Sequence, residues 1–116
     1  MKVNIELDMT PEEARRRGFS LLDVTRWLCA NPAAQVSLDS VKGAIAIGSD
    51  ADLVIWNPDD LFTVDASALQ HRHKITPYDS EPLSGVVQQT FLRGRKIYDV
   101  GQFTESPHGH MLLGRA

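Results

Sequence analysis

Apolar residues recur at helical spacing in the first third of the chain, between polar residues that mark helix ends. Residues 10–18 offer a capping threonine, a proline at the first helical position, two glutamates at the positive end of the helix dipole and a closing glycine. A second helix begins at Ser20, which has the spacing of a capping box with Asp23. Asn31-Pro32 then breaks the pattern and predicts a short helical restart through residues 33–35. The second helix carries an apolar stripe that needs a partner surface, made of Leu21, Val24, Trp27 and Leu28.

After residue 41 the pattern changes to short apolar runs separated by turn residues, which is typical of strands. Residues 42–47 and 51–56 predict two strands joined by a Gly48-Ser49-Asp50 turn. The second run is apolar enough for a strand that is buried on both faces. Residues 57–60 then predict a turn by their chemistry, and residues 61–64 predict a third strand.

The last part of the sequence predicts a hairpin and a tail. Residues 65–69 resemble a short capped helix, and a proline-containing loop follows it. Residues 86–92 and 95–99 are two apolar runs around an Arg93-Gly94 turn, which indicates a hairpin. Residues 104–116 show little periodicity, so we expect an extended and poorly anchored tail.

Helices come first and strands afterwards, which indicates an α+β fold with segregated rather than alternating elements. Two interpretations are open: a stand-alone α+β fold, or helices of one domain followed by strands of another. We expect three parts, namely a helical segment at residues 1–41, a β-rich segment at residues 42–103 and the tail at residues 104–116.

The composition is that of a soluble globular chain with a thin core. The 116 residues are 42% hydrophobic and 23% charged, which fits one domain, but short chains bury a small fraction of their surface. The formal net charge of -3 provides no positive field for a phosphate backbone, so we expect no nucleic-acid partner. No apolar run reaches the length of a membrane span. We interpret Arg15-Arg16-Arg17 as the last turn of a solvated helix rather than an anion site.

The single cysteine and the start of the chain both bear on the compartment. Cys29 cannot form an internal disulfide, which favours a reducing, cytoplasmic setting. It lies in an apolar stretch, so we predict a buried structural thiol rather than a nucleophile. Residues 1–9 include Glu6 and Asp8 and lack the basic and apolar regions of a secretion signal.

Two histidine pairs have the spacing of metal ligands. His71 and His73 show the local form of a binuclear metal motif. Together with His108 and His110 they would make a site of four histidines. Catalytic zinc, however, needs about three protein ligands on a rigid frame. Both pairs fall in segments predicted to be flexible, so we expect surface histidines.

Asp50 and Asp52 are one residue apart in a turn that leads into a strand, so we expect both to face the same side. Paired carboxylates perform acid/base chemistry only where a base or metal converges on them. We therefore interpret Asp50 as a turn residue.

Three stretches carry a more specific signal. The first is Glu13-Ala14-Arg15-Arg16-Arg17-Gly18-Phe19-Ser20 with Asn31-Pro32-Ala33. The second is Lys42-Gly43-Ala44-Ile45-Ala46-Ile47-Gly48-Ser49-Asp50-Ala51-Asp52-Leu53-Val54-Ile55-Trp56, and the third is His71-Arg72-His73-Lys74-Ile75-Thr76-Pro77-Tyr78. Together with residues 85–98 they resemble the end of an allantoinase, within the cyclic amidohydrolases that include dihydroorotase, dihydropyrimidinase and hydantoinase. The second stretch marks the wider superfamily, and the third narrows the resemblance to allantoinase.

The resemblance covers about residues 13–101 and implies a position within a larger fold. In such enzymes a TIM-like barrel is flanked by a small β-sandwich built from both chain ends, and the metals lie at the C-terminal ends of the barrel strands. Residues 13–34 would then be the last barrel helices, and residues from 45 onward the second half of the sandwich. Residues 1–11 are expected to depart from the family pattern, where the final barrel strand would run.

The resemblance also implies a chemistry, the metal-dependent opening of the hydantoin ring of allantoin to allantoate in purine catabolism. The family uses a binuclear divalent metal centre of zinc, whose ligands precede the matching helices. No catalytic, cofactor-binding or metal-binding residue is therefore expected in this chain, which would be inactive alone. The expected partners are the barrel domain or a homo-oligomer, with allantoin bound only by the intact enzyme. Lys74, Thr76 and Tyr78 are candidates to line the mouth of that active site.

Two functions of other classes stay open. One is a non-catalytic interaction or scaffold module, whose helix stripe and sandwich face bind a full-length relative or another protein. The other is a small metal-binding protein that uses the four histidines. Zinc retained after dialysis would favour the metal-binding protein, and release of allantoate would favour the enzyme.

Overall fold

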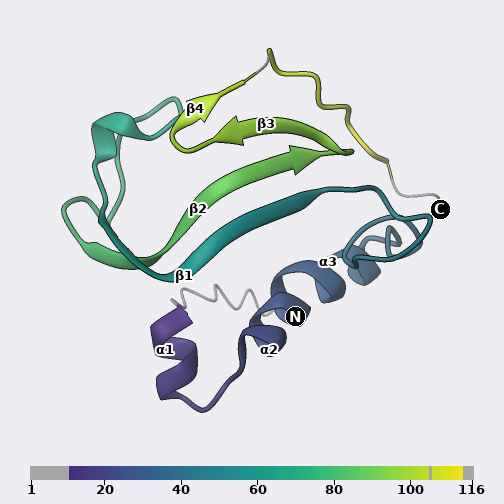
Figure 1. Cartoon of the computed structure of the whole chain (residues 1–116), viewed down its shortest axis with the longest axis horizontal. Helices are drawn as coiled ribbons and strands as arrows, with labels where there is room; N and C mark the ends of the chain where they lie inside the picture. The colour runs from purple at the N-terminus through teal and green to yellow at the C-terminus, as the bar shows by residue number, and fades with distance from the viewer. Residues whose placement is uncertain (1–10, 105, 114–116) are drawn as a thin grey trace.

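The structure, a computed structural model, describes residues 11–104 and 106–113. A helical segment comes first and an antiparallel sheet follows, with the helices on the β1 side of the sheet (Figure 1). The predicted order of an α+β fold is confirmed. The helices are α1 (Pro11–Arg16), α2 (Leu21–Thr25), the π-helical η1 (Arg26–Ala30), α3 (Asn31–Gln35) and the 3-10 helix η2 (Ala66–Ala68), and the strands are β1 (Leu53–Thr63), β2 (Pro82–Leu92), β3 (Arg95–Asp99) and β4 (Gln102–Phe103).

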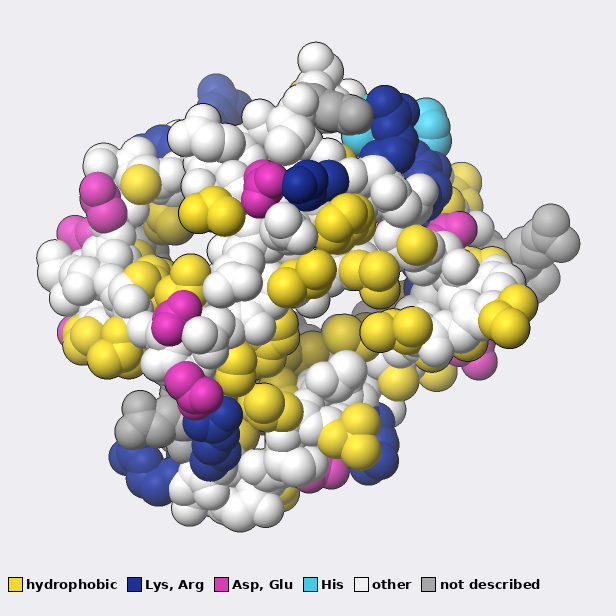
Figure 2. All heavy atoms as spheres, in the orientation of Figure 1, with side chains coloured by type: hydrophobic (Ala, Val, Ile, Leu, Met, Phe, Trp, Pro, Cys, Tyr) yellow, Lys and Arg dark blue, Asp and Glu magenta, His cyan; other side chains and the backbone are white. Residues whose placement is uncertain are grey.

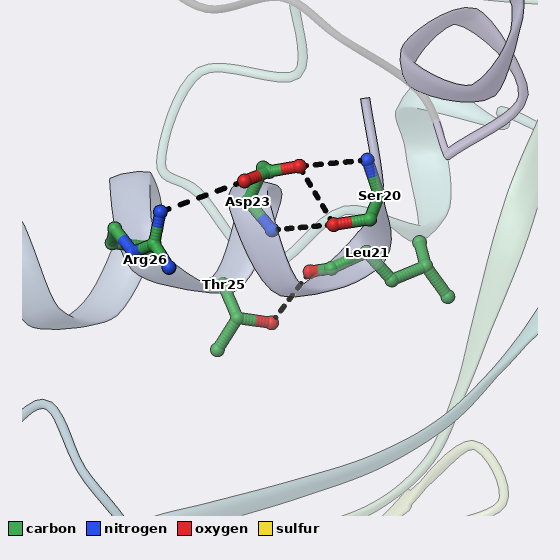
Figure 3. Close-up of polar contacts among 5 residues, drawn as sticks. All are labelled: Ser20, Leu21, Asp23, Thr25 and Arg26. Carbon is green, nitrogen blue, oxygen red and sulfur yellow. Dashed lines mark hydrogen bonds and ion pairs between the residues drawn. The ribbon is translucent and has the colours of Figure 1, made fainter. Parts of the chain in front are cut away.

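The predicted capping box opens α2. The Ser20 hydroxyl oxygen accepts a hydrogen bond from the Asp23 amide at 3.2 Å, and Asp23 Oδ2 accepts one from the Ser20 amide at 2.9 Å (Figure 3). Arg26 adds an ion pair of 3.6 Å to Asp23. These bonds satisfy donors that have no partner inside the helix, so the cap fixes where the helix begins.

Replacing Ser20 with alanine is expected to lower the free energy of unfolding by about 1 kcal/mol, because the cap acceptor for the Asp23 amide is lost. Urea denaturation followed by far-UV circular dichroism measures the change. Ser40→Ala, at an exposed position in the turn after α3, is the matched control and should leave the midpoint unchanged. Equal midpoints for the two variants would contradict the assigned role of Ser20.

The predicted short helix through residues 33–35 is confirmed as α3, but the predicted break before it is wrong, because α2, η1 and α3 form one continuous helical path. The Asn31 amide donates to the Arg26 carbonyl, five residues back, which is the π-helical register. Pro32, the second residue of α3, lacks the N–H that would continue the helical bonding, and its ring crowds the preceding turn. The wider turn before the proline therefore lets the helix continue, and sequence periodicity does not reveal such a turn.

The sheet has strand order β1-β2-β3-β4, and all its pairs are antiparallel. The predicted hairpin is confirmed as β2 and β3, joined at Arg93 and Gly94 with Leu92 opposite Arg95. Gly94 has a φ of +81°, the left-handed conformation that such a tight corner requires. β2 begins earlier than predicted, at Pro82, and pairs with β1 from Pro82 to Phe91, with two irregularities in the register.

The predicted strand at residues 42–47 is wrong, because this segment contains no strand. The Asp50 amide donates to the Val41 carbonyl at 2.9 Å, so the chain turns back on itself. Gly43 and Gly48, with φ of +84° and +91°, stand on either side of the apolar residues and allow this closure. A closed loop results, with Ile45 and Ile47 exposed at its tip.

Residues 51–64 also differ from the prediction of two strands separated by a turn. β1 runs through the predicted turn as one strand, with an irregular register between Asn57 and Leu61. Asn57 Oδ1 accepts a hydrogen bond from the Asp59 amide at 3.1 Å, which accommodates the irregularity. The prediction that this strand is buried on both faces is also wrong, since the fractional exposures of Val54 and Ile55 are 55% and 47%.

The segments after β1 and β4 agree more closely with the predictions made from the sequence. The predicted short helix is confirmed as η2. Asp65 caps its N-terminus, because Asp65 Oδ1 accepts a hydrogen bond from the Ser67 amide at 2.9 Å. Among the described residues after β4 there is no helix or strand, as expected for a tail. The tail is nevertheless anchored, because the His108 carbonyl accepts a hydrogen bond from the Arg93 guanidinium at 3.2 Å.

The core of the described chain is small. The buried hydrophobic residues are Ala14, Ala33 and Val64, and none of the larger described side chains is fully buried. The accessible surface is 9403 Å², whereas a compact monomer of this mass exposes about 6,300 Å². Hydrophobic side chains gather around a hollow between the sheet and the helical segment (Figure 2). Within the described ranges, no helix is long and apolar enough to cross a membrane.

Candidate functional site

Three charged side chains that are close in sequence form the best-defined polar cluster. Lys42 Nζ lies 2.8 Å from Asp50 Oδ2 and also binds Asp52 Oδ2. The Lys42 side chain is 19% exposed, which is less than for either carboxylate. Asp50 and Asp52 thus face the same side, as predicted. Lys42, Asp50 and Asp52 are called the Lys42 clasp below.

The clasp is connected to the turn between β2 and β3. Asp52 Oδ1 accepts a hydrogen bond from the Arg93 amide at 2.8 Å, and the Ala51 carbonyl accepts one from the Gly94 amide at 2.9 Å. One carboxylate therefore binds a side chain from the loop and a backbone group from the sheet. The geometry serves structure, since both Asp52 oxygens already have partners within the chain.

The electrostatics of the clasp favour its ionised form. Hydrogen bonds to Asp50 and then Asp52 raise the pKa of Lys42. The hydrogen bond from Lys42, followed by the Arg93 amide, lowers the pKa of Asp52. The stabilisation from Asp52 is thus lost as the pH falls through its lowered pKa, and that from Lys42 as the pH rises through its raised pKa. Neither shift prepares a proton donor or acceptor for neutral pH.

Gly43 brings the same loop against the helical segment. A Cβ at this position would lie 2.7 Å from the Ala33 Cβ and 2.8 Å from the Cys29 carbonyl oxygen. Only glycine permits this approach, and its φ of +84° is also one that side chains disfavour. The sequence gives no sign that Lys42, Gly43 and Arg93 act together, because Lys42 and Arg93 are far apart along the chain and only the fold brings them near one another.

The histidine pair His71-x-His73 lies in a long excursion between β1 and β2. The base of this excursion is closed by the Val64 amide, which donates to the Glu81 carbonyl at 3.0 Å, and by the Ser80 amide, which donates to the Val64 carbonyl at 2.8 Å. His71 and His73 are both exposed at its far part. The predicted surface position of this pair is confirmed.

The candidate mouth residues make local bonds within the same excursion. Lys74 Nζ donates to the Leu69 carbonyl, and Thr76 Oγ1 accepts a hydrogen bond from the Tyr78 amide at 3.2 Å. Thr76 and Tyr78 are half-buried, whereas Lys74 is exposed. These bonds hold the loop in shape, and a role for the three residues beside a substrate stays a prediction.

The remaining candidates do not converge on a site. His108 is half-buried with Nδ1 3.1 Å from the Ser106 carbonyl oxygen, while His110 is exposed. Cys29 is exposed, so the prediction of a buried thiol is wrong. Its neighbour Leu28 is 60% exposed, while Trp27 packs edge-on against Phe19. The described parts of the chain hold no group of three or more His, Cys, Asp or Glu residues placed to bind a metal ion, so these residues do not fit a binuclear metal centre.

Comparison with known proteins assigns the family. The profile described as "Amidohydrolase family" matches residues 1–97, which is most of the chain. The chain belongs to the amidohydrolase family. The match includes residues 1–11, so the expectation that they depart from the family pattern is wrong.

Curated relatives of this chain include allantoinases from a bacterium and a yeast. The chain is 54% identical over 100 residues to the allantoinase of Streptomyces avermitilis, covering 86% of this chain and 22% of that protein. It is 36% identical over 98 residues to the allantoinase of Saccharomyces cerevisiae, covering 84% and 21%. The chain thus spans about a fifth of the length of these relatives.

Similar solved structures are hydantoinases. The L-hydantoinase (dihydropyrimidinase) of Arthrobacter aurescens aligns with a TM-score of 0.75 and 31% identity, covering 83% of this chain and 21% of that one. A D-hydantoinase aligns with a TM-score of 0.73 and 28% identity, covering 79% and 20%. The α+β arrangement of this amidohydrolase chain therefore occurs inside larger proteins of the same family.

Proposed function

We propose that this chain is the C-terminal part of an allantoinase, which opens the hydantoin ring of allantoin by hydrolysis to give allantoate. The observation that carries the proposal is the 54% identity to an allantoinase over 100 residues. The His71-Arg72-His73-Lys74-Ile75-Thr76-Pro77-Tyr78 stretch supports allantoin over other cyclic amides, because it narrows the resemblance to this member of the group.

In this proposal the chain contributes scaffold rather than catalytic groups. The helical segment forms the end of a TIM-like barrel, and the sheet forms half of a flanking β-sandwich. The resemblance implies a binuclear zinc centre, which polarises the substrate and supplies hydroxide where it is bound. Since the described residues do not fit such a centre, we assign its ligands to the portion of the relatives that this chain does not match. A cytoplasmic location is part of the proposal, and the single cysteine supports it.

The proposed partner of the chain is the barrel domain. About 3,000 Å² of surface is exposed beyond that of a compact monomer with the same mass, for which about 6,300 Å² is expected against the 9403 Å² found. Large apolar side chains contribute to this surface, among them Leu22, Leu28 and Ile47, with exposures of 68%, 60% and 109%. An apolar surface of this kind is typical of an interface.

A chimera tests the function directly. In the Streptomyces avermitilis allantoinase, the segment matched by this chain is replaced with the corresponding residues of this chain. We expect the chimera to release allantoate with a turnover within about tenfold of the parent, a difference of about 1.4 kcal/mol in the barrier. The parent with the segment deleted is the control, and it should be inactive. A chimera that folds and binds metal like the parent but does not hydrolyse allantoin would contradict the proposal.

The second candidate function is a non-catalytic interaction module, and the same exposed apolar surface favours it. Such a module would bind a full-length relative or another copy without contributing to turnover. The chimera separates the two, because an interaction module has no reason to support catalysis in a foreign allantoinase.

A further inference from the structure

The Lys42 clasp lies where the helical segment and the sheet meet. On the helical side, Gly43 packs against Ala33 and against the Cys29 carbonyl oxygen, so the loop after α3 cannot move independently of the helices. On the sheet side, Asp52 and Ala51 bind the Arg93 and Gly94 amides. The chain between these two contacts is closed by Lys42 and by the bond from the Asp50 amide to the Val41 carbonyl.

Among the described residues, α1 is the helix that also contacts the sheet. The helices η1 and α3 pack against each other and make no close approach to any described strand, while α1 touches β1 and β2. The ion pair that ties α1 to β1, between Arg15 and Asp59, is largely exposed, with side chains 47% and 68% accessible. Exposed ion pairs of this kind contribute little to the free energy of folding. The Lys42 clasp is more enclosed than this pair, with the Lys42 side chain 19% exposed.

We propose that the Lys42 clasp is an electrostatic joint that holds the helical segment at a fixed angle to the sheet and opens when the charge of Lys42 is removed. This inference is independent of the catalytic function and applies to the chain as such. Opening would release the loop of residues 42–50 and let the apolar faces on both sides of the hollow change their relative position.

The full 116-residue chain provides the test, with two readouts. Hydrogen exchange is measured at the Asp50, Arg93 and Gly94 amides, whose acceptors belong to the joint or to residues directly beside it. A spin label on the exposed Cys29 and a second one on Gln88→Cys report the distribution of distances between η1 and β2. Lys42→Met keeps the length of the side chain without its charge, and Lys42→Arg keeps the charge.

For Lys42→Met we expect exchange at the three amides to rise at least tenfold and the distance distribution to become broader, while the β1–β2 ladder stays protected. Lys42→Arg should retain the wild-type values. Lys96→Met, which removes an i,i+3 pair with Asp99 inside the sheet, is the matched control and should also match wild type. Wild-type exchange and distances in a folded Lys42→Met chain would overturn the proposal.

If the Lys42→Met chain loses protection everywhere, the milder variant Asp50→Asn is measured in its place, because it removes one carboxylate of the clasp and leaves the bond between Lys42 and Asp52. Faster exchange at the three amides with an intact β1–β2 ladder supports the joint. Wild-type exchange at these amides in Asp50→Asn overturns it.

Discussion

Gly43→Ala is expected to lower the free energy of unfolding by about 3 kcal/mol, which combines a cost of about 1–2 kcal/mol for a side chain at positive φ with a similar cost for overpacking. The added methyl group would lie 2.7 Å from the Ala33 Cβ and 2.8 Å from the Cys29 carbonyl oxygen. Neither neighbour is the far end of a flexible side chain, so helix and loop must separate. Because Ala33 is one of the few buried residues, the loss falls on the core itself.

Gly48→Ala is the matched control for this experiment. Its φ of +91° is similar to that of Gly43, but a Cβ there meets no heavy atom within 4 Å. It should therefore show only the backbone cost, about 1–2 kcal/mol. Urea denaturation, followed by circular dichroism and tryptophan fluorescence, measures both variants. Equal losses of stability in the two would mean that the close approach to α3 does not contribute.

Local chemistry in the sequence predicted the elements whose stabilising bonds are also local. The Ser20 capping box, the Asp65 cap and the hairpin around Gly94 depend on residues within a few positions of one another, and all three are present in the structure. The order of helices before strands also follows from periodicity alone, which explains why the α+β class was predictable.

The wrong predictions share a different cause. An alternating apolar run such as residues 42–47 becomes a strand only when a neighbouring strand offers a ladder, and two glycines at positive φ close this run into a loop instead. Burial of Cys29 and of Val54 was inferred from apolar neighbours, yet burial also requires a covering surface, which the described residues lack. Long-range partners of this kind, like the pairing of Asp52 with the Arg93 amide, leave no local signal.

In the candidate site, too, the local arrangement could be predicted from the sequence and the long-range contacts could not. The spacing of Asp50 and Asp52 predicted that the two carboxylates share a side, but not that Lys42 lies between them. Family membership was accessible because the motifs that carry it are contiguous stretches of sequence. The catalytic residues of the proposed enzyme are not accessible from such stretches, since a site built at the ends of several barrel strands would take its residues from positions far apart in the sequence.

The purified 116-residue chain is expected to release no allantoate and to retain far less than one zinc ion per chain after dialysis. Catalytic zinc requires about three protein ligands held on a rigid frame. His71 and His73 are exposed on a loop, and the described residues offer no group of three candidate ligands. Elemental analysis after dialysis against zinc gives the metal content, and an allantoate assay at the same zinc concentration gives the activity.

The double variant His71→Ala/His73→Ala is the control, because a surface pair that binds no metal can be removed without changing the zinc content. Stoichiometric zinc in the wild-type chain that disappears in this variant would instead support the small metal-binding protein, with His108 and His110 as the further ligands. Turnover of allantoin by the isolated chain would overturn the assignment of all catalytic ligands to other parts of the enzyme. If the isolated chain is inactive and free of metal while the chimera is active, this segment contributes the scaffold of the enzyme and the barrel contributes its catalytic groups.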